Sequence, residues 1–448
     1  MIIEWTSIIL IILLLSIDLA IIKLIEKKTK INGEMKRKTF HITMGISMLT
    51  LPYIFTSIYS VAILAILAIV ILIILKYTKL KNGIGTVIYS VDRESWGEIF
   101  FVISVLVIFY LSKGDKILYS VPILILTLAD SVAALIGKNY GKKDISYMNE
   151  DSKSIEGSFM FFMTAFIITL VPLLLYTNIG REETLIISAI IGFNVSLMEM
   201  VSHSGNDNLL IPLTTYALLI THINLEVQSL RINLIILATI FILVTIANKV
   251  KSFSKLTLVE AFVVGYLTVT LYGIYGIFPP LMLFLTCLRF PKLRENEKNN
   301  LYDARIIETN VLVGIIIAGL ATITGEKSKF FITYSLAYSM HLSINTFVRL
   351  KYYFNLTETK SLIYAFSKGL IFIFVPSIII QKIIFKESIQ IITIVLSIIM
   401  LLISCIAIMI AKKEVEQEEI SIKNGLIHMK IVAVLIGIMT IAQFYNLI

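Results

Sequence analysis

Residues 59–76 read YSVAILAILAIVILIILK, an apolar run whose first charged side chain is Lys76. A helix of about 20 such residues crosses the hydrocarbon core of a bilayer. Because lipid offers the backbone no hydrogen-bond partners and strand alternation is absent, the run is predicted to be a transmembrane helix. Similar windows recur throughout, so we predict an all-α, polytopic integral membrane bundle of about 14–16 transmembrane helices. The windows lie near residues 4–22, 42–57, 59–76, 99–112, 118–137, 158–176, 185–202, 208–220, 232–247, 258–272, 274–290, 308–324, 330–348, 362–384, 388–410 and 429–447, with 258–290 either one hairpin or two spans.

The composition supports a membrane protein and argues against a nucleic-acid partner. Hydrophobic residues make up 57% of the 448 residues and charged residues 15%, and the mean hydropathy is +0.90. The net charge is +9, but the basic residues sit at the ends of apolar windows, where they act as topology signals and snorkelling side chains. They crowd residues 23–38, which places this loop in the cytoplasm and both termini outside.

Several common interpretations are excluded. Cys287 and Cys405 lie in apolar runs and are too few for a disulfide framework or a zinc site. Residues 1–22 lack a small-residue cleavage site, so they are predicted to be a first span rather than a signal peptide. No phosphate loop of the Gly-x-x-x-x-Gly-Lys-Ser/Thr type occurs, so a nucleotide would have to bind without one.

The polar residues that could perform chemistry form five clusters separated by apolar windows. If each window crosses the membrane once, all five converge at the cytoplasmic face. An enzyme that joins a soluble charged donor to a lipid acceptor needs this arrangement. The clusters are residues 37–41 (RKTFH), 93–98 (RESWGE), 130–138 (DSVAALIGK), 153–158 (KSIEGS) and 199–212 (EMVSHSGNDNLLIP).

Two of the clusters place carboxylates within or beside the membrane, where they indicate function. Asp130 shares a helix face with Ala133 and Gly137, and the alternative is a small-residue packing face with Asp130 as a structural hydrogen bonder. In the last cluster, Gly205 breaks a helix between Glu199 and the pair Asp207 and Asn208, and Pro212 is predicted to restart the next span. Carboxylate and amide oxygens suit a divalent cation. His203 is assigned no role.

The other clusters are basic and lie at predicted helix starts. Lys153, Ser154 and Gly157 precede a span whose free N–H groups favour phosphate, and the alternative is a serine cap beside an interfacial lysine. The segment 37–41 is predicted to open the second span and Glu98 the fourth, with topology signals as the alternative.

In order, the motifs RK-x-x-H, R-x-x-x-GE, D-x-x-A-x-x-x-G-K-x-x-G-K, KS-x-EGS and E-x-x-S-x-x-G-x-DN-x-x-x-P resemble the dolichol kinase and phytol kinase family over residues of about 35–220. The resemblance implies a multispan enzyme that phosphorylates the hydroxyl of a long isoprenoid alcohol, with CTP as donor and Mg²⁺ as cofactor. It implies catalytic and metal-binding roles for Asp130, Glu199 and Asp207, without identifying the base. Nucleotide or phosphate binding is expected from Arg37, Lys38, His41, Gly137, Lys138, Gly141, Lys142, Lys153, Ser154, Gly157 and Asn208, with Arg93 and Glu98 as further candidates.

The C-terminal half is predicted to be a second membrane domain, residues 251–448, following a polyprenol-kinase-like domain in residues 1–250. Residues 258–265 and 303–310 faintly resemble the phytyl-phosphate kinases. Residues 330–350, however, contain no acid where that family has an acidic stretch. We therefore expect this half to be structural or to channel substrate, without catalysis of its own.

Two other functions stay open. A multispan transporter or flippase of a charged lipid or small solute would carry polar residues through the membrane depth and repeated halves. A CTP-dependent diacylglycerol kinase or a phosphatidate cytidylyltransferase-like enzyme would use the same nucleotide and metal. The acceptor stays open between phytol, geranylgeraniol, dolichol, farnesol and diacylglycerol, and the oligomeric state is not specified.

Overall fold

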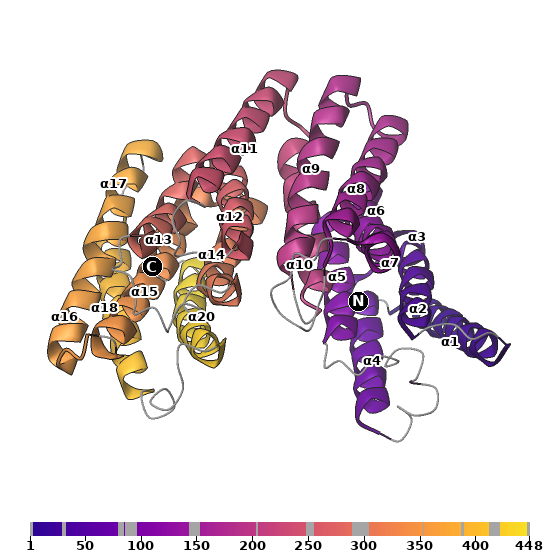
Figure 1. Cartoon of the computed structure of the whole chain (residues 1–448), viewed down its shortest axis with the longest axis horizontal. Helices are drawn as coiled ribbons and strands as arrows, with labels where there is room; N and C mark the ends of the chain where they lie inside the picture. Colours follow the sequence, from indigo (N-terminus) through magenta and orange to yellow (C-terminus); the bar gives the residue numbers. More distant parts are fainter. Residues whose placement is uncertain are drawn as a thin grey trace. The chain divides into compact units, whose positions relative to one another are not determined.

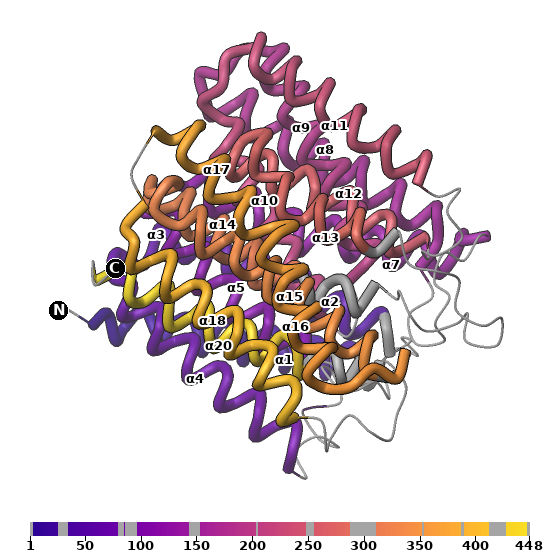
Figure 2. The backbone as a smooth tube through the Cα atoms, turned by 90° about the vertical axis from the view of Figure 1, so that its left-hand side faces the viewer, coloured from indigo at the N-terminus to yellow at the C-terminus, as the bar shows by residue number. Residues whose placement is uncertain are grey.

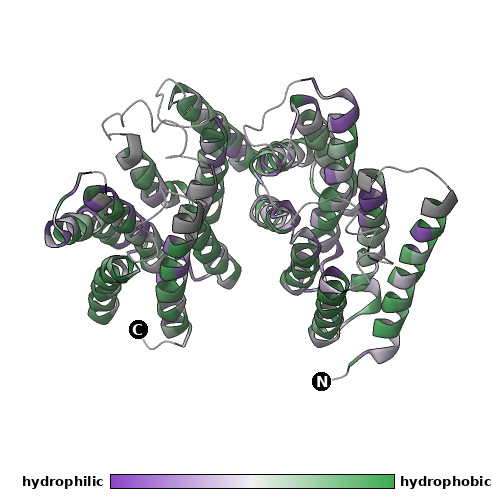
Figure 3. Cartoon of the chain, turned by 60° about the horizontal axis from the view of Figure 1, so that its bottom comes forward, coloured by the Kyte–Doolittle hydropathy of each residue, from purple (hydrophilic) through white to green (hydrophobic). Residues whose placement is uncertain are grey.

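The computed structural model describes residues 3–28, 33–78, 85, 96–142, 153–202, 205–247, 255–288, 304–352, 354–386, 389–411 and 422–445. The regular elements of these residues are all helices (Figure 1). Ten of the described helices are long and apolar enough to cross a membrane, and three shorter apolar helices accompany them. Figure 3 shows apolar residues along the helices of both halves of the chain. The prediction of an all-α, polytopic membrane bundle is confirmed.

The chain divides into two compact units, Met1–Ile235 and Ile236–Ile448. The division falls inside α11 (Val227–Ala247). The domain boundary predicted near residue 250 lies at residues outside the described set and stays a prediction.

Unit 1 is a bundle of helices. The helix α8 packs between α7 and α9, and α10 packs on α5, α6 and α9. The element bounds are α1 Trp5–Lys28, α2 Gly33–Met48, α3 Leu51–Ile54, α4 Ile58–Tyr77, α5 Gly97–Ser112, α6 Lys116–Leu124, the π-helix η3 Ile125–Ala129, α7 Asp130–Tyr140, α8 Ile155–Tyr176, α9 Arg181–Val201 and α10 Asp207–His222.

Unit 2 is built around α15, which packs against α14, α16, α18 and α20. Figure 2 shows α15, α16 and α18 as neighbouring tubes. Its elements are α12 Lys255–Tyr272, the 3-10 helix η4 Ile274–Ile277, α13 Phe278–Leu288, α14 Ala304–Thr324, α15 Lys327–Tyr352, α16 Glu358–Gly369, the π-helix η6 Leu370–Phe374, α17 Val375–Ile384, α18 Ile391–Ile410 and α20 Ile422–Phe444.

Two local predictions need correction. The second span was placed at residues 42–57, but α2 covers Gly33–Met48, so residues 37–41 lie inside the helix rather than before it. Pro212 lies inside α10, which starts at Asp207. For residues 258–290, which the sequence left open between one hairpin and two spans, the structure has α12 and α13 separated by Gly273, with a positive φ of 91°, and by η4. Hydropathy could not place the start of α2, because the helix includes the charged Lys38, which is paired with Asp130 on α7.

Candidate functional site

In unit 1 the first and third clusters meet through an ion pair between Lys38 and Asp130. Lys38 Nζ on α2 donates to Asp130 Oδ2 on α7 at 2.6 Å, and the two residues are 4% and 8% exposed. His41, one turn along α2, places Nε2 at 3.8 Å from the same carboxylate oxygen. Arg37 is half-buried and adds a further positive charge near this carboxylate. Asp130 is therefore a buried carboxylate held by a cation, as predicted for functional acids in membranes.

The π-helix η3 positions this pair. It ends at Ala129, immediately before Asp130, and His41 Nε2 lies 3.2 Å from the carbonyl oxygen of Leu126 within it. Single π-helical turns occur often at functional sites, because they leave carbonyls without regular helical partners. Gly45 lies against the side chain of Thr127, so α2 can approach η3 closely. The sequence interpretation missed η3, although Pro122, one turn earlier, is a signal of irregular helix.

The half-buried Lys153 and the buried Glu199 form a second ion pair. Lys153 Nζ lies 3.0 Å from Glu199 Oε1, and it also donates to the backbone carbonyls of Glu199 and of Ser202, the latter at 3.0 Å. Lysine at the C-terminal end of a helix satisfies its free carbonyls, here those of α9. Burial lowers the pKa of Lys153, but the carboxylates of Glu199, Asp207 and Asp130 raise it to a net value above its ordinary range. The lysine therefore stays charged at neutral pH.

The glycines of the third and fourth clusters let α7 and α8 approach each other. A Cβ on Gly157 would lie 3.0 Å from the carbonyl oxygen of Ala133 and 3.3 Å from Gly137 Cα. A Cβ on Gly141 would collide with the carbonyl oxygen of Gly137 and with Ser154. Ser154 caps α8, and its Oγ accepts a hydrogen bond from the N–H of Gly157 at 3.1 Å. Helix packing and capping thus account for these residues, and their role in phosphate binding stays a prediction.

We expect Gly157→Ala to destabilise the protein by about 2 kcal/mol, because the new methyl group meets backbone atoms that cannot move aside. Thermal unfolding in detergent measures the effect. Gly319→Ala on α14 is the control, since nothing lies within 4 Å of a Cβ there, and it should leave the unfolding temperature unchanged or slightly raised. Equal unfolding temperatures for the two variants would contradict the close approach of α7 and α8.

The fifth cluster meets the second at the start of α5. Asn208 is buried, and its Nδ2 donates to the carbonyl oxygen of Gly97 at 2.8 Å. Gly205 adopts a positive φ of 88°, which confirms the predicted helix break between Glu199 and Asp207. Asp207 starts α10 and is half-buried. Asn208 therefore connects the α9–α10 break to the residue before Glu98.

Some predicted site residues lie away from the buried pairs. Lys138 and Lys142 are exposed on or just after the end of α7, and the backbone N–H of Lys142 donates to Glu156 Oε2 at 3.2 Å. Glu98 is half-buried on the first turn of α5. Arg93 and His203 lie outside the described residues.

The described part of the chain contains no group of three His, Cys, Asp or Glu side chains arranged to hold a metal ion. Asp130 and Glu199 are each paired with a lysine instead. Magnesium commonly binds through one or two carboxylates together with substrate phosphates, rather than in an all-protein cage. The carboxylates of Glu199 and Asp207 both lie close enough to Lys153 to raise its pKa. Their oxygens are suitable ligands for a magnesium ion that enters together with a nucleotide.

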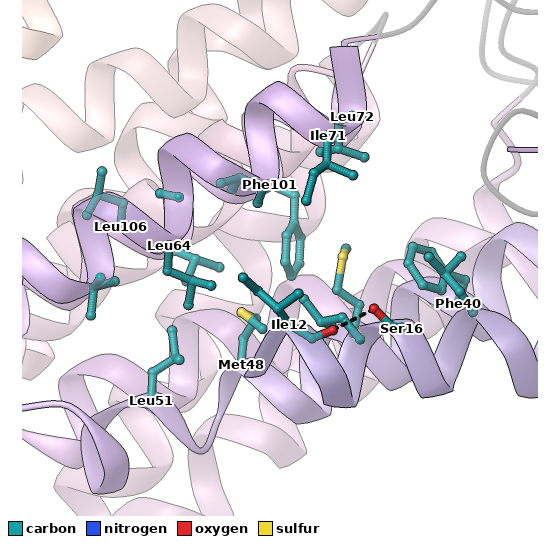
Figure 4. A pocket seen from close by; sticks show the side chains of 18 of the residues that line it. Ile12, Ser16, Phe40, Met48, Leu51, Leu64, Ile71, Leu72, Phe101 and Leu106 are labelled. Atoms are coloured by element: carbon teal, nitrogen blue, oxygen red, sulfur yellow. Dashed lines mark hydrogen bonds between the residues drawn. The ribbon is translucent and has the colours of Figure 1, made fainter. Parts of the chain in front are cut away.

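An apolar cleft in unit 1 has Phe101, the ring neighbour of His41, in its lining, and the sequence interpretation missed this cleft. Side chains of α1, α2, α3, α4 and α5 line it (Figure 4). Phe40 lies between Lys38 and His41 in the sequence, and Phe101 packs edge-on against the His41 ring with centroids 5.2 Å apart. No linear pattern marks the cleft, because its lining comes from four separate apolar runs.

The chain is distantly similar to a phytol kinase. It is 31% identical over 126 residues to the phytol kinase of Synechocystis sp.. The match covers 28% of this chain and 53% of that protein, so the chain spans about half the length of this curated relative. No family model matches the chain, and no solved structure matches it.

Unit 2 contains buried polar residues on α15. Ser335, Ser339, His341 and Ser343 are fully buried there. Among the described residues, neither ring nitrogen of His341 has a hydrogen-bond partner, and the same holds for Nε2 of the buried His428 on α20.

Proposed function

We propose that this chain is an integral membrane lipid kinase that transfers the γ-phosphate of CTP to the hydroxyl of a long-chain isoprenoid alcohol. One observation carries the proposal. Two lysine–carboxylate pairs, the buried Lys38–Asp130 and the partly buried Lys153–Glu199, are within electrostatic range of each other in unit 1. The distant similarity to a phytol kinase supports the reaction type, and the choice of CTP rests on the motif resemblance.

The acceptor hydroxyl belongs on the side of Asp130. His41, whose Nε2 lies 3.8 Å from this carboxylate, packs against Phe101 in the lining of the apolar cleft, whereas the Lys153–Glu199 pair lies at the end of α9. Lys38 Nζ contacts Asp130 Oδ2 at 2.6 Å. We assign Asp130 as the general base of the proposed reaction because it lies on the side of the acceptor hydroxyl, and in this role it takes the proton of the alcohol.

The donor phosphates belong on the side of Lys153. Phosphoryl transfer depends mainly on positioning and on neutralising charge. Lys153 stays charged, and the N-terminus of α8 next to it has the partial positive charge that favours phosphate. The exposed Lys138 and Lys142 are available to the remaining phosphates.

The proposed step balances as an in-line displacement. The alcohol oxygen, having given its proton to Asp130, forms a bond to the γ-phosphorus. The bond between that phosphorus and the oxygen bridging to the β-phosphate breaks, and CDP leaves with the electron pair. Mg²⁺ bound by Glu199 and Asp207 would supply charge neutralisation to the donor phosphates.

The direct test uses the full chain, purified in detergent, with CTP labelled in the γ-phosphate, Mg²⁺ and a panel of lipid alcohols. We expect label in the lipid phase with an isoprenoid alcohol, and weaker transfer from ATP. A folded protein that transfers label to no alcohol would contradict the proposal. In a second reaction the CTP is labelled in the cytidine. Label in the lipid phase from this CTP would indicate a cytidylyltransferase instead.

We propose that the site faces the cytoplasm, because lysines crowd the loops at this end of unit 1. Lys142→Cys places a thiol at an exposed position just after α7. We expect a membrane-impermeant maleimide to label it in inverted vesicles but not in intact cells. A separate variant, Lys113→Cys, places the thiol directly after the end of α5, on the other side of the membrane. The maleimide should label this variant in intact cells but not in inverted vesicles. Labelling of position 142 from outside would overturn the orientation.

We propose that unit 2 does not phosphorylate the product further. Residues 330–350 of α15 contain no acid, so this stretch offers no carboxylate ligands for Mg²⁺. The expected product is the monophosphate alone, even with excess nucleotide, and chromatography of the labelled lipids checks it. Diphosphate that disappears in His341→Phe would show that unit 2 is an active kinase.

Transport is a second candidate function, and the buried polar residues of α15 favour it. From Ser335 to Ser343 they extend over about 12 Å of helix, as a transport path through the membrane requires. In proteoliposomes, a proton or solute flux that is lost in His341→Phe while phosphoryl transfer persists would establish transport by unit 2. Absence of any flux from the parent chain would leave the kinase as the function.

A further inference from the structure

The side chain of Ser158 carries a buried hydroxyl group that the fold leaves without a partner. Among the described residues of unit 1, three side-chain atoms that water does not reach lack a hydrogen-bond partner: Ser158 Oγ, Glu4 Oε2 and Asn194 Oδ1. The other two are acceptor oxygens, so of these three only Ser158 has a hydrogen to donate. Ser158 is 7% exposed. An unpaired buried hydroxyl costs free energy, so packing alone does not account for a serine at this position.

Other buried hydroxyls of unit 1 are satisfied within their own helices. Thr169, three turns further along α8, donates to the carbonyl oxygen of Ala165 at 2.9 Å. The same bond to the carbonyl four residues earlier is made by Ser131, Ser188, Ser202 and Thr215. For Ser158 that carbonyl belongs to the cap residue Ser154, and it accepts the N–H of Ser158 at 3.0 Å but no bond from its hydroxyl. The hydroxyl of Ser158 is therefore available to a ligand.

Ser158 lies on the first turn of α8, between the two helices that carry the site carboxylates. Its neighbour Gly157 faces α7, since a Cβ there would lie 3.0 Å from the carbonyl oxygen of Ala133. Phe162, one turn after Ser158, faces α9, since its ring lies 3.3 Å from a Cβ placed on Gly192. Successive helical residues are rotated by about 100°. The Ser158 position therefore projects between the direction of α7 and that of α9.

The charged groups of the candidate site surround this end of α8. Lys153 precedes the cap of the helix, and its Nζ lies 3.0 Å from Glu199 Oε1, at the C-terminal end of α9. On the other side, Asp130 lies three residues, about 4.5 Å along α7, from Ala133, and its carboxylate is within electrostatic range of both Lys153 and Glu199. Ser158 thus lies where the proposed donor side and the proposed acceptor side of the site meet.

A phosphate oxygen is the ligand atom that suits this hydroxyl. The first turn of a helix has a partial positive charge that favours an anion, and Lys153 adds a full charge. Phosphate oxygens that carry no proton only accept hydrogen bonds, and an unpaired donor is what the position supplies. Ser158 is also five residues further into α8 than Lys153, on the way toward Asp130. It therefore suits the phosphate that is nearest to the acceptor.

We propose that Ser158 is a further catalytic residue, whose hydroxyl donates a hydrogen bond to an oxygen of the γ-phosphoryl group while this group passes from CTP to the alcohol. This inference rests on the proposed kinase function. The serine keeps its proton and forms no covalent bond, so the displacement balances as it does without it. A donor that is already in place when charge develops on the transferring group lowers the barrier, because nothing has to reorganise during the reaction.

The first test removes the hydroxyl and keeps the rest of the side chain. We expect Ser158→Ala to lower kcat for label transfer from CTP about tenfold to 100-fold, with little change in KM for the alcohol. Without nucleotide, its unfolding temperature should equal or exceed that of the parent, because the variant no longer buries an unpaired hydroxyl. A serine that only packs helices would give the opposite pair of results, a lower unfolding temperature with unchanged kcat.

Two further variants control this measurement. Thr169→Val removes a hydroxyl from the same helix, but one whose bond to Ala165 is internal to α8, so kcat should stay within about twofold of the parent. Ser158→Thr keeps the hydroxyl and should recover part of the activity that Ser158→Ala loses.

Nucleotide binding tests the contact with the terminal phosphate without requiring catalysis. The rise in unfolding temperature on adding β,γ-methylene-CTP with Mg²⁺ is compared with the rise on adding CDP with Mg²⁺, each for the full chain in detergent. In Ser158→Ala the rise with the triphosphate analogue should be smaller than in the parent. The rise with CDP, which has no γ-phosphate, should be the same in both chains. An equal loss with both nucleotides would overturn the γ-phosphate contact.

The outcomes separate this inference from the proposed function. If the parent phosphorylates an alcohol and Ser158→Ala does so at the same rate, the role of Ser158 fails and the kinase stands. If the parent phosphorylates no alcohol, but the triphosphate analogue stabilises it more than it stabilises Ser158→Ala while CDP stabilises both equally, the kinase proposal fails and the γ-phosphate contact stands.

Discussion

Replacing Asp130 by Asn should lower kcat about 10³-fold while the protein still folds and inserts. The substitution keeps the size of the side chain but removes the base that takes the alcohol proton. It also leaves Lys38 without its carboxylate partner at 2.6 Å. Label transfer from CTP to phytol measures the activity, and size-exclusion chromatography in detergent reports the fraction of folded protein.

Asp18→Asn is the matched control for this prediction. Asp18 also lies in a membrane helix, α1, where Oδ2 accepts a hydrogen bond from Ser47 at 3.2 Å, and it is not part of either lysine pair. Its neutralisation should leave kcat within a few-fold of the parent. If Asp130→Asn lost folded protein in proportion to activity, Asp130 would be a packing residue, as the small-residue alternative for α7 predicts.

Replacing Lys153 by Met should lower kcat about 10²- to 10³-fold, because the charge that neutralises the donor phosphates is lost. Stability should fall as well, by about 3 kcal/mol, since Glu199 is left buried and the carbonyls at the end of α9 lose their donor. Kinetics of label transfer and thermal unfolding in detergent measure the two effects. Lys153→Arg, which keeps the charge, should recover part of the activity.

A double variant separates the two consequences. Glu199→Gln in the Lys153→Met background removes the unpaired carboxylate, so the unfolding temperature should recover toward that of the parent. The activity should stay low, because the phosphate-binding charge is still missing. Recovery of both quantities together would show that Lys153 acts only by holding α9 in place.

The sequence was sufficient for the properties that depend on single helices. Residues 59–76 were expected to form a helix, and α4 covers Ile58–Tyr77. The break at Gly205 and the cap at Ser154 also follow from local chemistry. Transfer of an apolar run into lipid is decided within that run, so periodicity and composition suffice to predict it.

Only the tertiary structure decided which polar groups meet. Lys38 pairs with Asp130, 92 positions along the chain, and Lys153 pairs with Glu199, 46 positions along. The free-energy cost of removing each charge from water is offset only by a partner from a distant part of the sequence. These pairs explain why α2 extends through its charged residues and why the hydropathy window began it too late. The glycines at 137 and 157 serve the approach of α7 and α8. The cleft beside Phe40 exists only where five helices assemble, since no single run of sequence encloses space.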